Sequence, residues 1–345
     1  MMTQALVLYS GSLASRLALK LAEEIWGLDI VVVYFRSPFF EEREGLQQAF
    51  RELARRLPFR TKTLKREYLR LALGGGGLPF PCGACRRVLL LRAARMARRL
   101  RAQYIVTGEV VEKGGVGEGE ILRLEAQLGL EGHIIRPLSG LLLPPTRAER
   151  RGEWPREALF DLRAGDLRGL QALAGELGLE GDLDQARFCS LSDPVYAGRL
   201  LAVLREGLPT VNTLRLLGFR HFFFLPPDLK VVVALEPEEQ AALQTLFLPT
   251  DVRLYLPVPR SPLVLARAGW AAYTEEERRR AVVQAAGIAL AVAGFPGGET
   301  CDVCFRFEWE EETKRLLVVA PQPSELPLQP GDGLIPPPAE VYLTS

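Results

Sequence analysis

The chain has 345 residues, of which 48% are hydrophobic and 25% are charged, and its formal net charge is +1. This composition excludes an intrinsically disordered protein, and the length is sufficient for two or three domains. No apolar run reaches the length of a membrane span and no signal peptide is visible, so we expect a cytoplasmic protein without a membrane partner. Abundant arginine and proline with little asparagine fit a heat-adapted source.

The first expected element is a buried parallel strand over residues 5–9, followed by a turn of small residues over 10–15. A helix follows, because apolar residues then recur every four positions. A strand, a small-residue turn and a helix together aim backbone N–H groups and a helix N-terminus at a phosphate. The candidate phosphate-binding residues of this turn are Ser10, Gly11, Ser12 and Ser15.

Strands and helices alternate over the next hundred residues. The expected strands cover 29–34 and 103–107, and the expected helices cover 42–57 and 87–100. This alternation predicts an α/β fold with a parallel sheet covered on both faces, and a ligand at the carboxyl ends of the strands. Thr107, Gly108 and Glu109 come at such a strand end, and Glu109 is the acid best placed for a role there.

Changes in composition divide the chain into four expected parts. A parallel-sheet domain covers 1–145, and a helical middle region that carries Cys189 covers 146–218. A small α+β domain covers 219–325, and a proline-rich extended tail covers 326–345. Within the α+β domain we expect a helix over 275–292 and strands over 221–225, 230–235, 252–256, 306–309 and 316–320.

Positive charge is concentrated between Arg51 and Arg101, where fifteen Lys or Arg residues stand against two acids. A segment this basic is suited to the phosphate backbone of a nucleic acid, and a solvated arginine face is an equally good interpretation. The candidate RNA-binding side chains are Arg86, Arg87, Arg92, Arg95 and Arg99.

The chain has five cysteines, and two pairs have the spacing Cys-x-x-Cys. Cys82 and Cys85 come just before the arginine-rich helix, where a helix N-terminus and neighbouring arginines favour a thiolate at Cys85. Such a pair is a metal half-site, a redox pair or two unrelated thiols. For Cys301 and Cys304 the alternatives are a disulfide, half of a zinc site, or a structural pair in a tight turn.

Several motifs carry a family resemblance. Residues 79–94, ProPheProCysGlyAlaCysArgArgValLeuLeuLeuArgAlaAla, and 104–109, TyrIleValThrGlyGlu, resemble tRNA thiouridylases of the PP-loop superfamily. Further matches follow in order over roughly two thirds of the chain: Arg136–Ser139 with Leu143–Thr146, Cys189–Pro194 and Arg220–Phe222. The turn at 10–15 resembles the PP-loop Ser-Gly-Gly-x-Asp-Ser, with Ser12 in place of a glycine and Ala14 in place of the aspartate.

The resemblance implies an adenine nucleotide α-hydrolase-like fold and a mechanism. ATP with magnesium adenylates a uridine carbonyl, and sulfur then displaces AMP. The sulfur travels as a persulfide or on a [4Fe–4S] cluster held by three cysteines, here Cys82, Cys85 and Cys189. The turn at 10–15 and residues 107–109 would hold the nucleotide. Because Ala14 offers no carboxylate, we expect weak ATP binding.

The partners implied are tRNA or another RNA, a sulfur donor, and a protein partner or a second copy of the chain. An alternative from another class is a catalytically inactive PP-loop paralogue that binds RNA or a partner subunit. A third interpretation, an amidotransferase-type PP-loop synthetase, leaves Cys189 unexplained.

Overall fold

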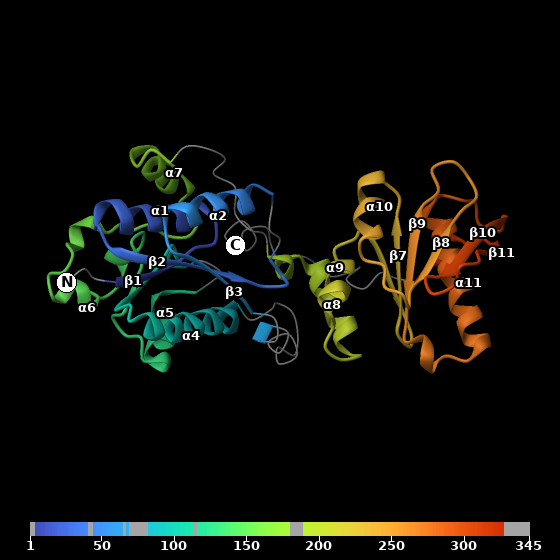
Figure 1. The fold of residues 1–345 in the computed structure, drawn as a ribbon, viewed down its shortest axis with the longest axis horizontal. Helices are drawn as coiled ribbons and strands as arrows, with labels where there is room; N and C mark the ends of the chain where they lie inside the picture. The colour runs from blue at the N-terminus through green and yellow to red at the C-terminus, as the bar shows by residue number, and fades with distance from the viewer. Residues whose placement is uncertain are drawn as a thin grey trace. The chain divides into compact units, whose positions relative to one another are not determined.

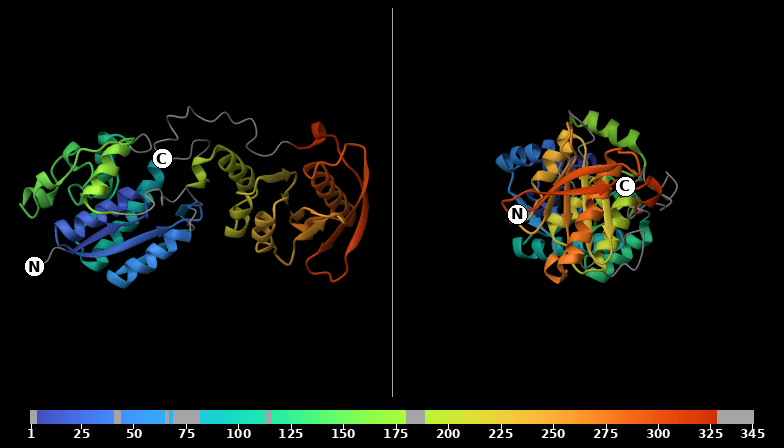
Figure 2. Two further views of the ribbon diagram at one scale, coloured as in Figure 1. Left: turned by 90° about the horizontal axis from the view of Figure 1, so that it is seen from above. Right: turned by 90° about the vertical axis from the view of Figure 1, so that its right-hand side faces the viewer.

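The structure is a computed structural model that describes residues 4–40, 44–64, 67–68, 82–112, 116–179 and 189–327. The described chain forms two compact units, the first ending at Ser192 and the second beginning at Asp193 (Figures 1 and 2). The four-part division expected from composition, with boundaries near 145, 218 and 325, stays a prediction, and most of the expected tail lies outside the described residues.

Unit 1 contains a five-stranded parallel sheet with the order β3-β2-β1-β4-β5, which confirms the expected α/β fold class. The strands are β1 (Gln4–Leu8), β2 (Asp29–Arg36), β3 (Phe59–Thr63), β4 (Tyr104–Thr107) and β5 (Ile134–Ile135). Leu6 of the central strand pairs with Val31 on one side and Ile105 on the other, and all three are buried. The apolar runs of the sequence therefore become strands that are covered on both faces.

Helices cover both faces of this sheet. They are α1 (Leu13–Lys20, continued by a π-helical turn over Leu21–Ile25), α2 (Glu44–Arg56), α4 (Cys82–Leu100), α5 (Glu118–Leu128), α6 (Arg147–Arg150) and α7 (Leu167–Glu176). In Figure 1, α1 and α2 lie on one face and α4 and α5 on the other. The expected stripe is confirmed on α1, where Leu17 and Leu21 are buried.

The start of the arginine-rich helix differs from the sequence expectation. The arginine-rich helix begins at Cys82 and not at residue 87, so the Cys-x-x-Cys pair lies inside the first turns of α4 and not before them. Apolar periodicity missed this start because Cys-Gly-Ala-Cys carries no apolar stripe, although its small residues are compatible with a helix.

Unit 2 contains a six-stranded antiparallel sheet with the order β11-β10-β8-β9-β7-β6. The strands are β6 (His221–Leu225), β7 (Leu229–Ala234), β8 (Val252–Tyr255), β9 (Leu263–Arg267), β10 (Thr300–Phe307) and β11 (Lys314–Val319). The helices are α8 (Pro194–Leu204), α9 (Val211–Leu216), α10 (Pro237–Gln244) and α11 (Glu275–Val292). The apolar face of α11 packs against the sheet through residues such as Ala285 and Ala289.

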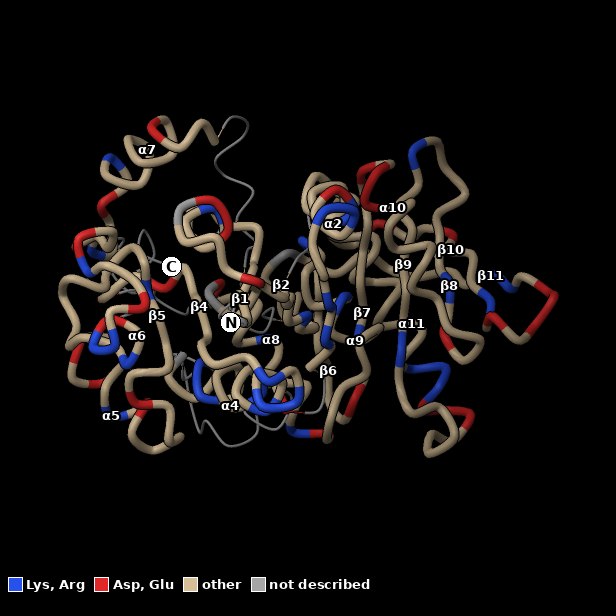
Figure 3. Tube along the Cα trace, turned by 60° about the vertical axis from the view of Figure 1, so that its left-hand side comes forward, with Lys and Arg blue, Asp and Glu red and all other residues tan. Residues whose placement is uncertain are grey.

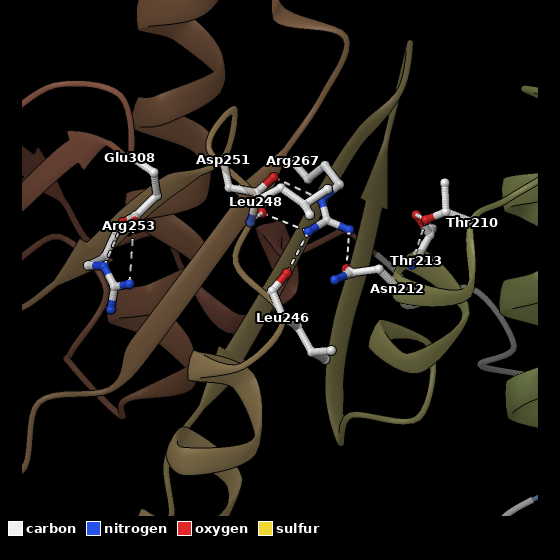
Figure 4. Close-up of polar contacts among 9 residues, drawn as sticks. All are labelled: Thr210, Asn212, Thr213, Leu246, Leu248, Asp251, Arg253, Arg267 and Glu308. Carbon is white, nitrogen blue, oxygen red and sulfur yellow. Dashed lines mark hydrogen bonds and ion pairs between the residues drawn. The ribbon is translucent and has the colours of Figure 1, made fainter.

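A buried polar network joins α9 to the sheet of unit 2 (Figure 4). The guanidinium of Arg267 donates to both carboxylate oxygens of Asp251, at 2.8 and 2.6 Å. It also donates to Asn212 Oδ1 at 2.8 Å and to the Leu246 carbonyl at 2.9 Å. Because Asp251 is fully buried, this ion pair is held in a low-dielectric interior where each partner depends on the other.

The structure corrects the expectations for Cys301 and Cys304. Both lie in β10, which is an extended strand and not a tight turn. Residues three positions apart in a strand point to opposite faces, so these two thiols do not form a disulfide with each other or share a metal ion. Cys301 packs against the α11 side of the sheet, whereas Cys304 is buried on the other face.

No helix among the described residues combines the length and the apolar character that a membrane crossing requires.

Candidate functional site

The turn after β1 has the geometry of an anion site. Gly11 has a φ of 84°, a conformation that favours glycine. Ser12 is the N-cap of α1, and its Oγ accepts the backbone N–H of Ser15 at 3.3 Å. Leu13 and Ala14 are the first two helical residues, so their N–H groups have no acceptor within the helix. The turn therefore presents amide donors and a helix N-terminus, which suit a phosphate group.

The serine side chains of this turn hydrogen-bond to one another. Ser10 Oγ lies 2.9 Å from Ser12 Oγ and donates to Ser15 Oγ at 3.2 Å. Ser15 Oγ donates to the Ser12 carbonyl at 2.9 Å, and the Ser10 N–H donates to Ser15 Oγ at 3.2 Å. The structure thus brings the four predicted turn residues together. A bound phosphate would compete with these internal bonds for the same hydroxyls.

Ala14, which stands where the PP-loop pattern has an aspartate, faces an apolar cluster. Its side chain is buried with Leu17, Leu21, Val110 and Leu138. A carboxylate at this position would be desolvated among aliphatic side chains, which is costly without a partner. The surroundings of Ala14 therefore suit an apolar side chain and not a carboxylate.

Gly108 places the end of β4 directly against the first turn of α1. A Cβ at Gly108 would lie 2.3 Å from the Ala14 carbonyl oxygen and 2.6 Å from the Ser15 backbone nitrogen. Only glycine permits this approach of two backbones. Residues 107–109 and the turn at 10–15, both predicted to hold a nucleotide, are therefore adjacent.

Glu109 connects β4 to α4 and to the segment after β5. It forms an ion pair with Arg86 of α4, and Arg136 Nε donates to Glu109 Oε2 at 2.8 Å. Arg136 is buried and also pairs with Glu125 of α5. We refer to these four residues as the Glu109 network.

Burial and the neighbouring charges together determine the protonation of the Glu109 network. Burial raises the pKa of Glu109, but the Arg136 and Arg86 guanidinium groups outweigh it and hold that pKa below its usual value. Burial raises the pKa of Glu125, and Arg136 does not fully offset this rise. Glu109 is therefore a charged carboxylate that fixes α4 against the strand end, not a free acid or base.

Cys85 lies in the first turns of α4, beside Arg86 of the Glu109 network. Its side chain is half-buried, and Cys85 Sγ lies 3.3 Å from the hydroxyl of Tyr68, to which it donates. Tyr68 is buried, and its neighbour Glu67 forms an ion pair with Arg92 further along α4. The segment at 67–68 therefore contacts α4 twice, once at the candidate thiol.

Cys189 is connected to the surroundings of Cys85 by contacts that involve Phe40. Cys189 and Phe40 form an isolated antiparallel bridge, and the Ser190 N–H donates to the Phe39 carbonyl at 2.8 Å. The Phe40 ring contacts the Tyr68 ring edge-on, with 5.9 Å between centroids. Phe40 and Tyr68 thus connect the backbone at Cys189 to the side chain of Cys85.

The third predicted thiol, that of Cys82, belongs to a side chain outside the described part of the structure. Among the side chains that are described, no three His, Cys, Asp or Glu residues are grouped to hold a metal ion. The donor types of Cys85 and Cys189 fit an iron–sulfur cluster, and the complete three-cysteine ligand set stays a prediction.

The predicted RNA-binding arginines divide into two groups. Arg86 and Arg92 are half-buried and form ion pairs with Glu109 and Glu67. The side chains of Arg87, Arg95 and Arg99 are exposed on α4, which carries several blue Lys or Arg segments in Figure 3. Only the exposed group is open to a phosphate backbone.

Sequence reasoning missed Tyr68, Phe40, Arg136 and Glu125. Arg136 belongs to the motif Arg136–Ser139, but nothing in its spacing indicated an ion pair with Glu109. Tyr68 and Phe40 carry no motif, because their position comes only from contacts between segments far apart in the chain.

No protein-family model matches the chain, and no curated protein sequence matches it. A solved structure of the U34-tRNA thiolase NcsA from Methanococcus maripaludis with its [4Fe-4S] cluster is 13% identical, with a TM-score of 0.34, over 61% of this chain and 68% of that chain. The C-terminal part of the fibronectin/fibrinogen-binding protein from Streptococcus suis is 11% identical, with a TM-score of 0.25, over 46% of this chain and 72% of that chain. Neither likeness indicates which residues of this chain act.

Proposed function

We propose that the protein transfers sulfur to a uridine of an RNA such as tRNA, as a thiouridylase-like transferase, with Cys82, Cys85 and Cys189 in the sulfur chemistry. One observation carries this proposal. Direct contacts join the turn at 10–15, the end of β4 and helix α4. The Gly108 backbone lies against Ala14, and Glu109 forms an ion pair with Arg86. The candidate phosphate-binding turn and a candidate thiol therefore belong to one connected part of unit 1.

The proposed reaction balances with ATP and sulfide as co-substrates. The uridine carbonyl oxygen attacks the α-phosphorus of ATP and pyrophosphate leaves. Sulfide then attacks the carbonyl carbon of the adenylated uridine. The bond from this carbon to the AMP oxygen breaks, AMP departs, and the product is a thiocarbonyl. A [4Fe–4S] cluster on three thiolates, when bound, would supply an iron with an open position for sulfide.

The chain's own residues would bind and orient the reactants. The amide donors of the turn at 10–15 would hold a phosphate, and the exposed arginines of α4 would contact the RNA backbone. Arg86 and Glu109 act as positioning residues, because they fix the first turns of α4 on which Cys85 lies.

A second candidate function is favoured by the surroundings of Ala14. The apolar cluster around this residue would desolvate the PP-loop carboxylate. This suits a paralogue that binds RNA or a partner subunit without turning over ATP.

Analysis of nucleosides by mass spectrometry tests the proposal. Full-length protein reconstituted without oxygen is incubated with unmodified tRNA, ATP, magnesium and sulfide. We expect thiouridine from the wild type and a loss of orders of magnitude for Cys85→Ser and Cys189→Ser, because each removes a thiol from the chemical step. Cys301→Ser, which changes a thiol in unit 2, is the matched control and should retain activity. Binding of tRNA without any thiolated product would instead support the second candidate.

A further inference from the structure

A cavity of about 420 Å³ lies in unit 1 away from the candidate site. It is lined by the ends of α4 and α5, the start of β4 and part of α6. Its size falls within the range of roughly 300–1,000 Å³ that is usual for small-molecule sites. The cavity lies at the amino end of β4, whereas Thr107 and Glu109 mark the opposite, carboxyl end. The cavity is therefore separate from the turn at 10–15.

Apart from the phenol of Tyr104, the titratable side chains that line this cavity are basic: Arg98, His133, Arg147 and Arg151. Arg151 also forms an ion pair with Glu153, at 3.5 Å. In the described part of the chain, the side chains of Arg98 and Arg147 have no hydrogen bond or ion pair. Arg98 lies in the last turn of α4, where a cation offsets the helix dipole, but Arg147 comes from α6 and has no such role. Two guanidinium groups that form no ion pair with the described residues therefore border one cavity.

The rest of the lining is mostly apolar. Ala94, Ala97 and Ile105 are buried residues of its wall, and Leu130 adds to the same surface. The exposed Gln103 offers an amide that both donates and accepts hydrogen bonds. A ligand that fits this lining has an anionic group for the guanidiniums and a flat, weakly polar body for the wall.

We propose that this cavity binds a nucleoside phosphate, with Arg98 and Arg147 on the phosphate and the base against the alanine-lined wall. Guanidinium groups bind phosphate through paired, charge-assisted hydrogen bonds. The ligand is either a free mononucleotide or one nucleotide of an RNA strand. The proposal does not rest on sulfur transfer, since the cavity lies at the opposite end of β4 from the candidate site.

Calorimetric titration of the full-length protein with uridine monophosphate and with pentauridylate tests this proposal. The measurements are made in a Ser12→Asp background, because aspartate keeps the N-cap of α1 while its charge repels phosphate from the turn. We expect saturable binding of at least one probe, weakened at least about tenfold by Arg98→Ala/Arg147→Ala. Arg168→Ala, which removes an exposed arginine of α7, is the matched control and should bind as the parent does.

Binding of uridine monophosphate identifies a free nucleotide as the source, and binding of pentauridylate alone identifies an RNA strand. The proposal is overturned if neither probe binds, or if the double variant binds as tightly as the control. Both arginines are exposed, so the circular dichroism of the double variant should match the parent. A failed thiolation assay with a positive titration would reject the proposed function and leave this site standing.

Discussion

Arg136→Met should destabilise unit 1 by about 3–5 kcal/mol, the cost of removing one partner from a buried ion pair. Arg136 is 3% exposed and holds both Glu109 and Glu125. Without it, Glu109 keeps its ion pair with Arg86, but Glu125 loses its ion pair in the interior. The measurement is urea unfolding monitored by hydrogen exchange. Peptides from β1 and β4 report on unit 1, and peptides from β7 report on unit 2.

The matched control is Arg163→Met, which removes an arginine from an ion pair with Glu112 that is about half exposed. An exposed pair of this kind contributes about 0–1 kcal/mol, so this variant should unfold almost as the wild type does. Equal stability of the two variants would contradict the importance of the Glu109 network. Mutation is the sharper probe here than pH, because Glu109 and Glu125 have pKa shifts of opposite sign and their pH effects on stability partly cancel.

Asp251→Asn should have a comparable effect on unit 2, about 3–5 kcal/mol, because the Arg267 charge would lose its buried counter-ion. The Arg267 contact to Asn212 also ties α9 to the sheet, so exchange protection should fall in α9 and β9 together. Peptides of β1 and β4 in unit 1 should keep their protection.

Glu276→Gln serves as the control in unit 2, since it changes an exposed ion pair with Arg280 on the surface of α11. We expect less than about 0.5 kcal/mol for this variant. A loss of stability in Asp251→Asn as small as in Glu276→Gln would contradict this account. The Arg267 network of Figure 4 would then not be the connection between α9 and the sheet.

Much of the fold follows from periodicity. The apolar run of β2 and the long amphipathic pattern of α11 lie within two residues of the expected ranges. The edge strand β3 was missed because its sequence, PheArgThrLysThr, is mostly polar and four of its five residues are exposed. β5 has only two residues, too few for any pattern. Short or exposed strands depend on their partners and not on their own sequence.

The candidate site is predictable in part for a related reason. The turn at 10–15 is local, so its small residues and flanking elements were sufficient to predict its geometry. The Glu109 network brings together residues up to 50 positions apart, and Tyr68 meets Cys85 across 17 positions. Such contacts are set by packing of the whole unit, which a single sequence does not encode in any local pattern.

The central claim is that cysteines from separate segments serve one site. The most direct measurement is the iron content and visible absorption of the full-length protein, reconstituted with iron and sulfide without oxygen. We expect a broad brown absorption and bound iron in the wild type and in Cys301→Ser. Both should be lost in Cys85→Ser and in Cys189→Ser, because a cluster held by three thiolates does not survive the loss of one. Iron binding that is unchanged in Cys189→Ser would contradict the claim.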